Sequence, residues 1–123
     1  NADFHAARLH LGYCLDKVGK TDEALAVYRE AVERTPSSTT PLYNLCLLYL
    51  RLKRLDEAED SLRSDPPSAQ RHSQLLKVRY NLALLLRVKE RKRAADHFEF
   101  ILKVNPRYPK AQQMWQDIAR WRK

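Results

Sequence analysis

The chain has 123 residues, 44% of them hydrophobic and 31% charged, with only 2 Gly and 6 Pro; this mixture is typical of a packed helical domain and not of a disordered chain. Leu, Ala, Arg, Lys and Glu dominate while β-branched residues are sparse, which argues against a β-sheet. The formal net charge is +8, but residues 1–64 carry −1 and residues 65–123 carry +9. No apolar run approaches the roughly 18 residues of a membrane span, so we expect no membrane segment within these residues. No signal-peptide pattern is present, but the sequence begins with Asn1 and not with Met, so a targeting segment outside it stays open.

Hydrophobic periodicity, together with helix start and stop signals, predicts seven helices joined by short turns. Asp56 followed three residues later by Glu59 resembles a capping box, which would mark a helix start. Pro36 and Pro106 are expected to end the helices that precede them. The predicted helices span about residues 3–18, 21–35, 40–52, 56–64, 70–88, 92–104 and 109–121.

Three segments of the chain share one layout of residues. LYNLCLLYLRLKRLDEAEDSL (42–62) and RYNLALLLRVKERKRAADHF (79–98) share a Tyr-Asn-Leu triplet, an apolar stretch, a basic turn and an Ala four residues before a bulky side chain. HLGYCLDKVGKTDEALAVYREAVERTP (10–36) follows the same order. The aligned residues are Leu11, Gly12, Leu15, Ala24, Tyr28 and Pro36, then Leu42, Leu45, Cys46, Tyr49, Ala58 and Leu62, then Leu82, Ala83, Leu86, Ala94, Phe98 and Pro106.

This layout resembles the tetratricopeptide repeat, in which Leu-Gly, an aromatic residue, Ala, a second aromatic residue and a closing Pro recur at fixed offsets. The first repeat departs from the pattern at Arg8 and Leu15, the second lacks the closing Pro, and the third has a turn one residue shorter. The resemblance implies an all-α, right-handed α-solenoid of helix pairs A and B, with about seven helices. It implies a single domain over residues 1–123, with repeats at about 5–38, 39–75 and 76–108 and a capping helix over 109–121.

Packing explains the small residues of the pattern. Gly12, Cys46 and Ala83 would let each helix A approach its helix B, where Ala24, Ala58 and Ala94 lie in turn. SDPP (64–67) falls inside a longer insertion over residues 64–75 and is expected to cut the second helix B short. In the last helix, Ala111, Trp115, Ile118 and Ala119 share one face, which we expect to cover the third pair as an end cap.

Catalytic and metal-binding motifs do not emerge from the sequence. His5, His10, His72 and His97 have no Cys or carboxylate at metal-ligand spacing, and Gly12 and Gly19 cannot form a phosphate-binding loop. We therefore predict a protein that is not an enzyme, with no cofactor and no metal site. Cys14 and Cys46 lie in apolar stretches and are predicted to be buried, reduced thiols, which favours the cytoplasm or another reducing compartment.

The family resemblance implies a concave groove built from helix A side chains, where a scaffold or adaptor holds a peptide or helix of a partner protein. Asn44 and Asn81 are its most informative residues, because an amide donates to and accepts from a peptide backbone at once; capping or bridging of neighbouring helices is the alternative. The cations Arg51, Lys77 and Arg87 predict an acidic partner. The groove residues expected are Tyr13, Lys17, Tyr43, Asn44, Arg51, Lys77, Tyr80, Asn81, Arg87 and Lys110, with Leu9, His10, Leu47, Leu84, Gln113 and Arg120 beside them.

Three further interpretations of the sequence stay open. An RNA-associated repeat protein would use the +9 half, but Arg87, Lys89, Arg91, Lys92 and Arg93 run through an inter-helix turn, where their side chains diverge, so nucleic-acid binding is disfavoured. A co-chaperone that grips an acidic chaperone tail would match the family's carboxylate clamp at only two of five positions. A homo-oligomer is also possible.

Overall fold

The computed structural model describes residues 2–63 and 72–123, and within them the chain forms seven α-helices and no strand. The predicted helices all appear, and where both the predicted and the observed end lie within the described residues, they differ by at most two residues. Residues 64–71, which contain SDPP and most of the insertion, lie outside the described residues. The helices are α1 (Ala2–Lys17), α2 (Thr21–Arg34), α3 (Thr40–Arg51), α4 (Leu55–Arg63), α6 (Ser73–Leu86), α7 (Arg91–Val104) and α8 (Ala111–Trp121).

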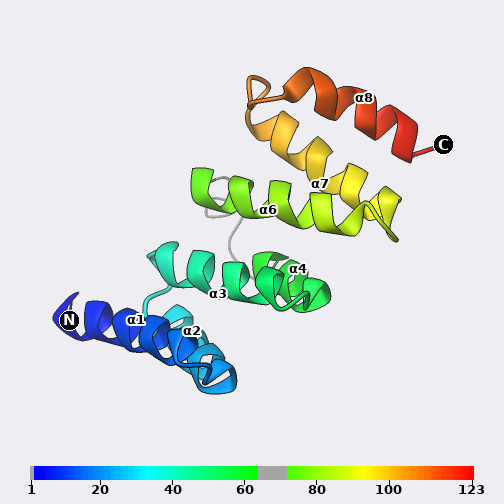
Figure 1. Cartoon of the computed structure of the whole chain (residues 1–123). Helices are drawn as coiled ribbons and strands as arrows, with labels where there is room; N and C mark the ends of the chain where they lie inside the picture. The colour runs from blue at the N-terminus through cyan, green and yellow to red at the C-terminus, as the bar shows by residue number, and fades with distance from the viewer. Residues whose placement is uncertain (1, 64–71) are drawn as a thin grey trace.

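The helices stack in chain order into an α-solenoid, with α1 at one end and α8 at the other (Figure 1). Three pairs pack within themselves: α1 with α2, α3 with α4, and α6 with α7. Each later pair packs on the helix before it, α3 on α2 and α6 on α4, and α8 packs on α7. Helix A of the second repeat also contacts helix A of the third. This arrangement confirms the predicted all-α repeat architecture.

Small residues set the spacing within each pair, as the sequence predicts. A Cβ atom built on Gly12 would lie 2.6 Å from Cε1 of Tyr28, so only glycine fits without moving that ring. At the corresponding places Cys46 and Ala83 are fully buried, as are their counterparts Ala24, Ala58 and Ala94 on the three B helices.

The turns between helices A and B use left-handed backbone where the repeat has its full length. Gly19 has a φ of +88° and Lys53, one repeat later, has a φ of +62°. Each precedes a residue whose N–H reaches back five positions, Lys20 to Leu15 and Arg54 to Tyr49. The third turn lacks one residue, and there the N–H of Glu90 instead reaches back four positions to Leu86 at 2.7 Å. The deletion therefore removes the left-handed position from the turn.

Two expectations about burial are wrong. In α8 the buried hydrophobic residues are Met114, Ile118 and Trp121, whereas Trp115 is 50% exposed and Ala119 is also exposed. The reason is the orientation of α8, whose Trp121 ring packs against Phe98 of α7 at a centroid distance of 5.1 Å.

Cys14 is exposed, because it faces outward from the first helix of the stack, whereas Cys46 is buried as predicted. Neither thiol is in a disulfide. No helix in the described parts of the chain is both long enough and apolar enough to cross a bilayer.

Candidate functional site

A cavity of about 290 Å³ lies between α1 and α3, the A helices of the first two repeats. Four of the predicted groove residues meet there, and Asp16, Tyr28, Leu47 and Leu48 complete the lining. Leu47 and half-exposed Tyr13 offer apolar surface. The predicted residues in this cavity are Tyr13, Lys17, Asn44 and Arg51.

The charge of this cavity is mixed, which the sequence-based expectation missed. Arg51 forms an ion pair with Asp16 across the two repeats, and this hydrogen bond raises the pKa of Arg51. Lys17 places its Nζ 5.2 Å from the centre of the Tyr13 ring, a cation–π contact. Asp16 was not recognised because its partner is 35 residues away and only the stacking of repeats brings them together.

The remaining predicted groove residues lie outside this cavity. Tyr43 is half-buried against the core, and Tyr80 stacks on Phe98 with ring centroids 5.3 Å apart, so the interhelix packing role applies to Tyr80. On α6, Lys77 is exposed and Asn81 half-buried. Arg87 caps the C-terminus of α6 and Lys110 precedes α8; both are exposed.

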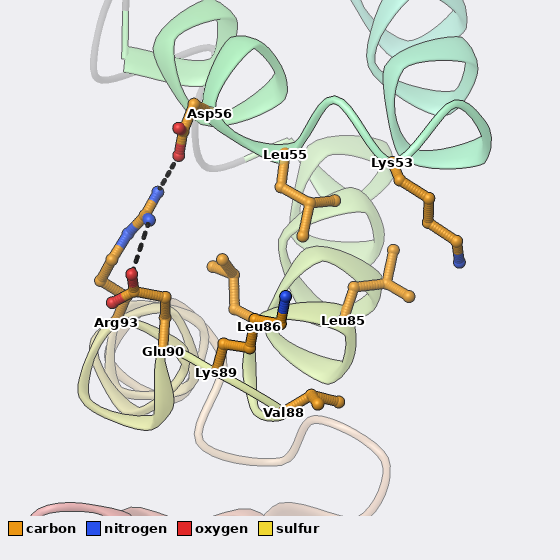
Figure 2. Close-up of a pocket in the computed structure, with 9 residues that line it drawn as sticks. All are labelled: Lys53, Leu55, Asp56, Leu85, Leu86, Val88, Lys89, Glu90 and Arg93. Carbon is orange, nitrogen blue, oxygen red and sulfur yellow. Dashed lines mark hydrogen bonds and ion pairs between the residues drawn. The ribbon is translucent and has the colours of Figure 1, made fainter.

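A larger cavity, of about 450 Å³, lies at the turn edge of the solenoid between the second and third repeats (Figure 2). Leu55, Leu85, Leu86 and Val88 contribute its apolar lining. Its charged lining comes from Lys53, Asp56, Lys89, Glu90 and Arg93.

The cationic run over residues 87–93 is thereby divided. Lys89 and Arg93 line the cavity, while Arg91 and Lys92 are exposed on the first turn of α7. Arg93 is held by Asp56, whose Oδ1 lies 2.9 Å from its Nη2. The run is thus the charged turn that the sequence indicates, apart from Arg93, which reaches back to the second repeat.

A buried polar network joins α4, α6 and α7. Nη1 of Arg79 donates to Nδ1 of His97 at 3.0 Å, so Nε2–H of His97 donates to Oε2 of Glu59 at 2.9 Å. All three side chains are nearly inaccessible to solvent. Arg63 and Arg93 also approach the Glu59 carboxylate, at 2.9 and 3.1 Å. Glu59 therefore does not close the predicted capping box: α4 begins at Leu55, and this carboxylate points toward the third repeat.

Burial fixes the protonation states in this network. Burial lowers the pKa of His97, and the positive charge of nearby Arg79 lowers it further. The hydrogen bond to Glu59 acts to raise this pKa but does not outweigh those two effects. Burial acts to raise the pKa of Glu59, but the hydrogen bonds from His97 and Arg93 outweigh it and the pKa lies below its ordinary value. Burial also lowers the pKa of Arg79 to about 10, and its guanidinium lies 3.8 Å from the centre of the Phe100 ring.

The network joins two repeats through ionised Glu59 and neutral His97. One feature of the sequence indicates this network. Polar residues lie beside the small packing residues of two B helices, in Ala58–Glu59 and in Ala94–Ala95–Asp96–His97. Among residues 2–63 and 72–123, no group of three or more His, Cys, Asp or Glu side chains is placed to hold a metal ion.

Comparison with known proteins agrees with the repeat register. Residues 17–82 match the tetratricopeptide repeat family, which is more than half of the chain. The chain belongs to the tetratricopeptide-repeat family. This fold generally serves as a non-catalytic protein-interaction scaffold, and the family match supports the general class of interaction scaffold for this chain.

The relatives by sequence are long proteins. Over 76 residues, covering 50% of the chain, it is 41% identical to the protein O-mannosyl-transferase TMTC2 of Mus musculus and 40% identical to that of Homo sapiens. Each match covers only 9% of the relative's length. The transferase activity in that name therefore belongs to those proteins and is not carried to this repeat segment.

Solved structures share the fold at low sequence identity. A structure of MamA from AMB-1 aligns with 98% of the chain and 75% of its own length, with a TM-score of 0.63 and 19% identity. A MamA D159K mutant aligns with 98% of the chain and 80% of its own length, with a TM-score of 0.60 and 19% identity. These likenesses show that the chain stacks its helices as other repeat solenoids do.

Proposed function

We propose that this chain is a scaffold that holds an extended segment of a partner protein in the groove along α1, α3 and α6. The supporting observation is the cavity between α1 and α3, where the repeat register predicted Tyr13, Lys17, Asn44 and Arg51 and where all four line one space. The whole of residues 1–123 would act as the single binding domain, without a catalytic role and without a cofactor.

The chemistry of the cavity indicates what the partner segment contains. Asn44 can accept a peptide N–H and donate to a peptide C=O, which suits a backbone without a fixed sequence. Tyr13 and Leu47 provide apolar contact area for a side chain. Lys17 provides positive charge at the wall, and Lys77 extends it on α6. An extended segment with an apolar residue followed by an acidic one fits this order of groups.

Photocrosslinking would identify the partner. p-Benzoylphenylalanine in place of half-exposed Tyr13 captures proteins that enter the cavity, and the same residue in place of exposed Lys92 on α7, which does not line the cavity, provides the control. The proposal expects partners that are crosslinked from position 13 and not from position 92. Equal capture from both positions would refute the groove assignment.

Affinity measurements with the identified partner then test individual groups. We expect Asn44→Ala to weaken binding about tenfold, because two hydrogen bonds to the peptide backbone are lost. Lys17→Glu should weaken it further, whereas Lys92→Glu, the same charge change on exposed α7, should bind like the parent protein. A larger effect from Lys92→Glu than from Lys17→Glu would move the site away from the groove.

The alternatives rest on less support. Binding to RNA predicts retention on heparin or single-stranded RNA that falls steeply with salt, and absence of retention near physiological salt would exclude it. For chaperone tails, Tyr13 stands in the cavity where the clamp requires an amide, so we do not propose that function. A reducing compartment stays part of the proposal, because Cys14 is an exposed thiol.

A further inference from the structure

The cavity of about 450 Å³ at the turn edge of the solenoid lies apart from the groove. No described residue lines both this cavity and the cavity between α1 and α3. It is bounded by the turn into α4, the end of α6 and the turn into α7, so helices of the stack lie on both sides of it (Figure 1). Further repeats at either end of the solenoid would pack on α1 or α8 and would leave this edge as it is.

The repeat register explains why space is left at this edge. In the second repeat the ring of Tyr49 is buried, and the guanidinium of Arg54 lies 5.4 Å from its centre and covers it. In the third repeat the place of Tyr49 is taken by Leu86 and that of Arg54 by Glu90. Both replacements are smaller, and both line the cavity.

The floor of the cavity is apolar and only partly covered. Leu55 and Leu85 line it and are half-buried, and Val88 adds an apolar side chain that is 78% exposed. An apolar side chain that entered the cavity would remove surface of all three residues from water. The floor therefore favours a ligand with a bulky apolar group.

The charged groups around this floor form two sets (Figure 2). Arg93 holds both anions of the lining, Asp56 at 2.9 Å and Glu90 at 4.0 Å. Lys53 and Lys89 are exposed, and no carboxylate of the described residues pairs with either ammonium. The two lysines therefore give the cavity positive charge that the protein itself does not compensate.

The backbone around this edge adds cations where they lower stability. Lys53 has a φ of +62°, at the place that Gly19 holds in the first repeat and where glycine is less strained. The first turns of α2 and α4 contain acidic residues, whereas that of α7 contains none and has exposed Arg91 and Lys92. Positive charge at a helix N-terminus opposes the helix dipole. Attraction of an anionic partner explains both features.

We propose that this cavity binds a short acidic segment of a partner protein, as a contact surface separate from the groove. One bulky apolar side chain of the segment lies against Leu55, Leu85 and Val88. Carboxylates on either side of it meet Lys53 and Lys89. These lysines come from the turns of two different repeats, so an extended chain with two acidic residues reaches both, whereas a single carboxylate reaches one.

Chemical-shift mapping on the intact, isotope-labelled chain tests the site. The probe is the peptide acetyl-Gly-Asp-Leu-Asp-Gly-amide, and we expect it to shift the backbone amides of residues 53–56 and 85–93 with a Kd of about 1 mM. Two matched peptides are the controls, one with Lys in place of both Asp residues and one with Ala in place of Leu. Each control should bind about fivefold more weakly or less, because it lacks either the charge or the apolar group.

Charge reversal tests the two lysines. Lys53→Glu and Lys89→Glu should each weaken binding of the acidic peptide about fivefold or more, because a carboxylate of the peptide then meets an anion. Lys92→Glu makes the same change on an exposed residue of α7 that does not line the cavity. It should change the Kd by less than about twofold, because solvent and salt screen an exposed charge that does not touch the ligand.

Several outcomes would overturn the proposal. They are the absence of shifts at residues 53–56 and 85–93 up to about 5 mM peptide, equal shifts with the basic peptide, or an effect of Lys92→Glu as large as that of Lys89→Glu. Stronger binding of octanoate than of the peptide would assign the cavity to a small amphiphile instead. Shifts of these amides when the protein alone is concentrated would assign it to a second copy. Shifts at Tyr13 or Asn44 report on the groove and leave this site unaffected, because neither residue lines it.

Discussion

The substitution Glu59→Ala tests whether the buried network between the second and third repeats stabilises the solenoid. The change removes the carboxylate that accepts the Nε2–H of His97 at 2.9 Å and approaches Arg93 and Arg63 at 3.1 and 2.9 Å. Because α4 carries Glu59 while α7 carries His97 and Arg93, the loss falls on the interface between repeats. In repeat proteins such interfaces supply much of the stability.

The size of the stability loss in Glu59→Ala depends on which partners of Glu59 can turn toward water. Arg63 is 67% exposed and Arg93 33% exposed, so both can turn toward solvent and contribute little to the loss. His97 cannot, since its side chain is 6% exposed, and its buried N–H donor would be left without an acceptor at about 1–3 kcal/mol. Arg79 also loses the nearby negative charge that offsets its burial. Together these effects predict a loss of about 3 kcal/mol, near the lower end for breaking a buried charged pair.

Urea unfolding followed by circular dichroism at 222 nm measures this loss directly. Glu30→Ala provides the matched control, because Glu30 pairs with Arg34 at 2.9 Å on an exposed helix surface and should cost under about 0.5 kcal/mol. If Glu59→Ala costs less than about 1 kcal/mol, the network does not hold the repeats together and the reasoning from burial is wrong.

Three further predictions rest on single groups. Because the pKa of His97 lies below its ordinary 6.5, the unfolded chain binds more protons than the folded chain, and the free energy of unfolding should fall as the pH drops through 6.5. His97→Gln keeps a donor and an acceptor, so its urea unfolding midpoint should change less between about pH 7.5 and about pH 5.5 than that of the parent protein. Thermal melting should show that Lys53→Gly stabilises the fold by about 1 kcal/mol, because residue 53 has a φ of +62°, which glycine adopts without strain. Lys89→Gly should not stabilise the fold, because residue 89 lies outside the left-handed region. Iodide should quench the fluorescence of half-exposed Trp115 and spare buried Trp121, and quenching that survives Trp115→Phe would contradict the orientation of α8.

The repeat pattern of the sequence predicts most of the fold. Gly12, Cys46 and Ala83 are recognisable from sequence because close helix packing admits only small side chains, and this requirement recurs at a fixed spacing. The shorter third turn was visible as a missing residue. As a consequence, this turn lacks the left-handed position that Gly19 and Lys53 occupy in the other two turns. Only the backbone angles of the structure show this difference.

The cavity between α1 and α3 contains only some of the residues that the family resemblance placed together. Tyr13, Lys17, Asn44 and Arg51 line it, because helical periodicity puts the residues of each helix on one face. Tyr80, which was also predicted to line the groove, instead packs its ring on Phe98. Periodicity gives the direction of a side chain and not the depth of the neighbours around it.

The sequence by itself determined the helices, the repeat and the small residues between helices, because these depend on local spacing and recur along the chain. Only the tertiary structure decided the pairing of Arg51 with Asp16, the burial of Glu59 with His97, and the exposure of Cys14 and Trp115. Each of these depends on which helix lies next in space. A side chain at the end of a solenoid is exposed, while its counterpart one repeat away is buried.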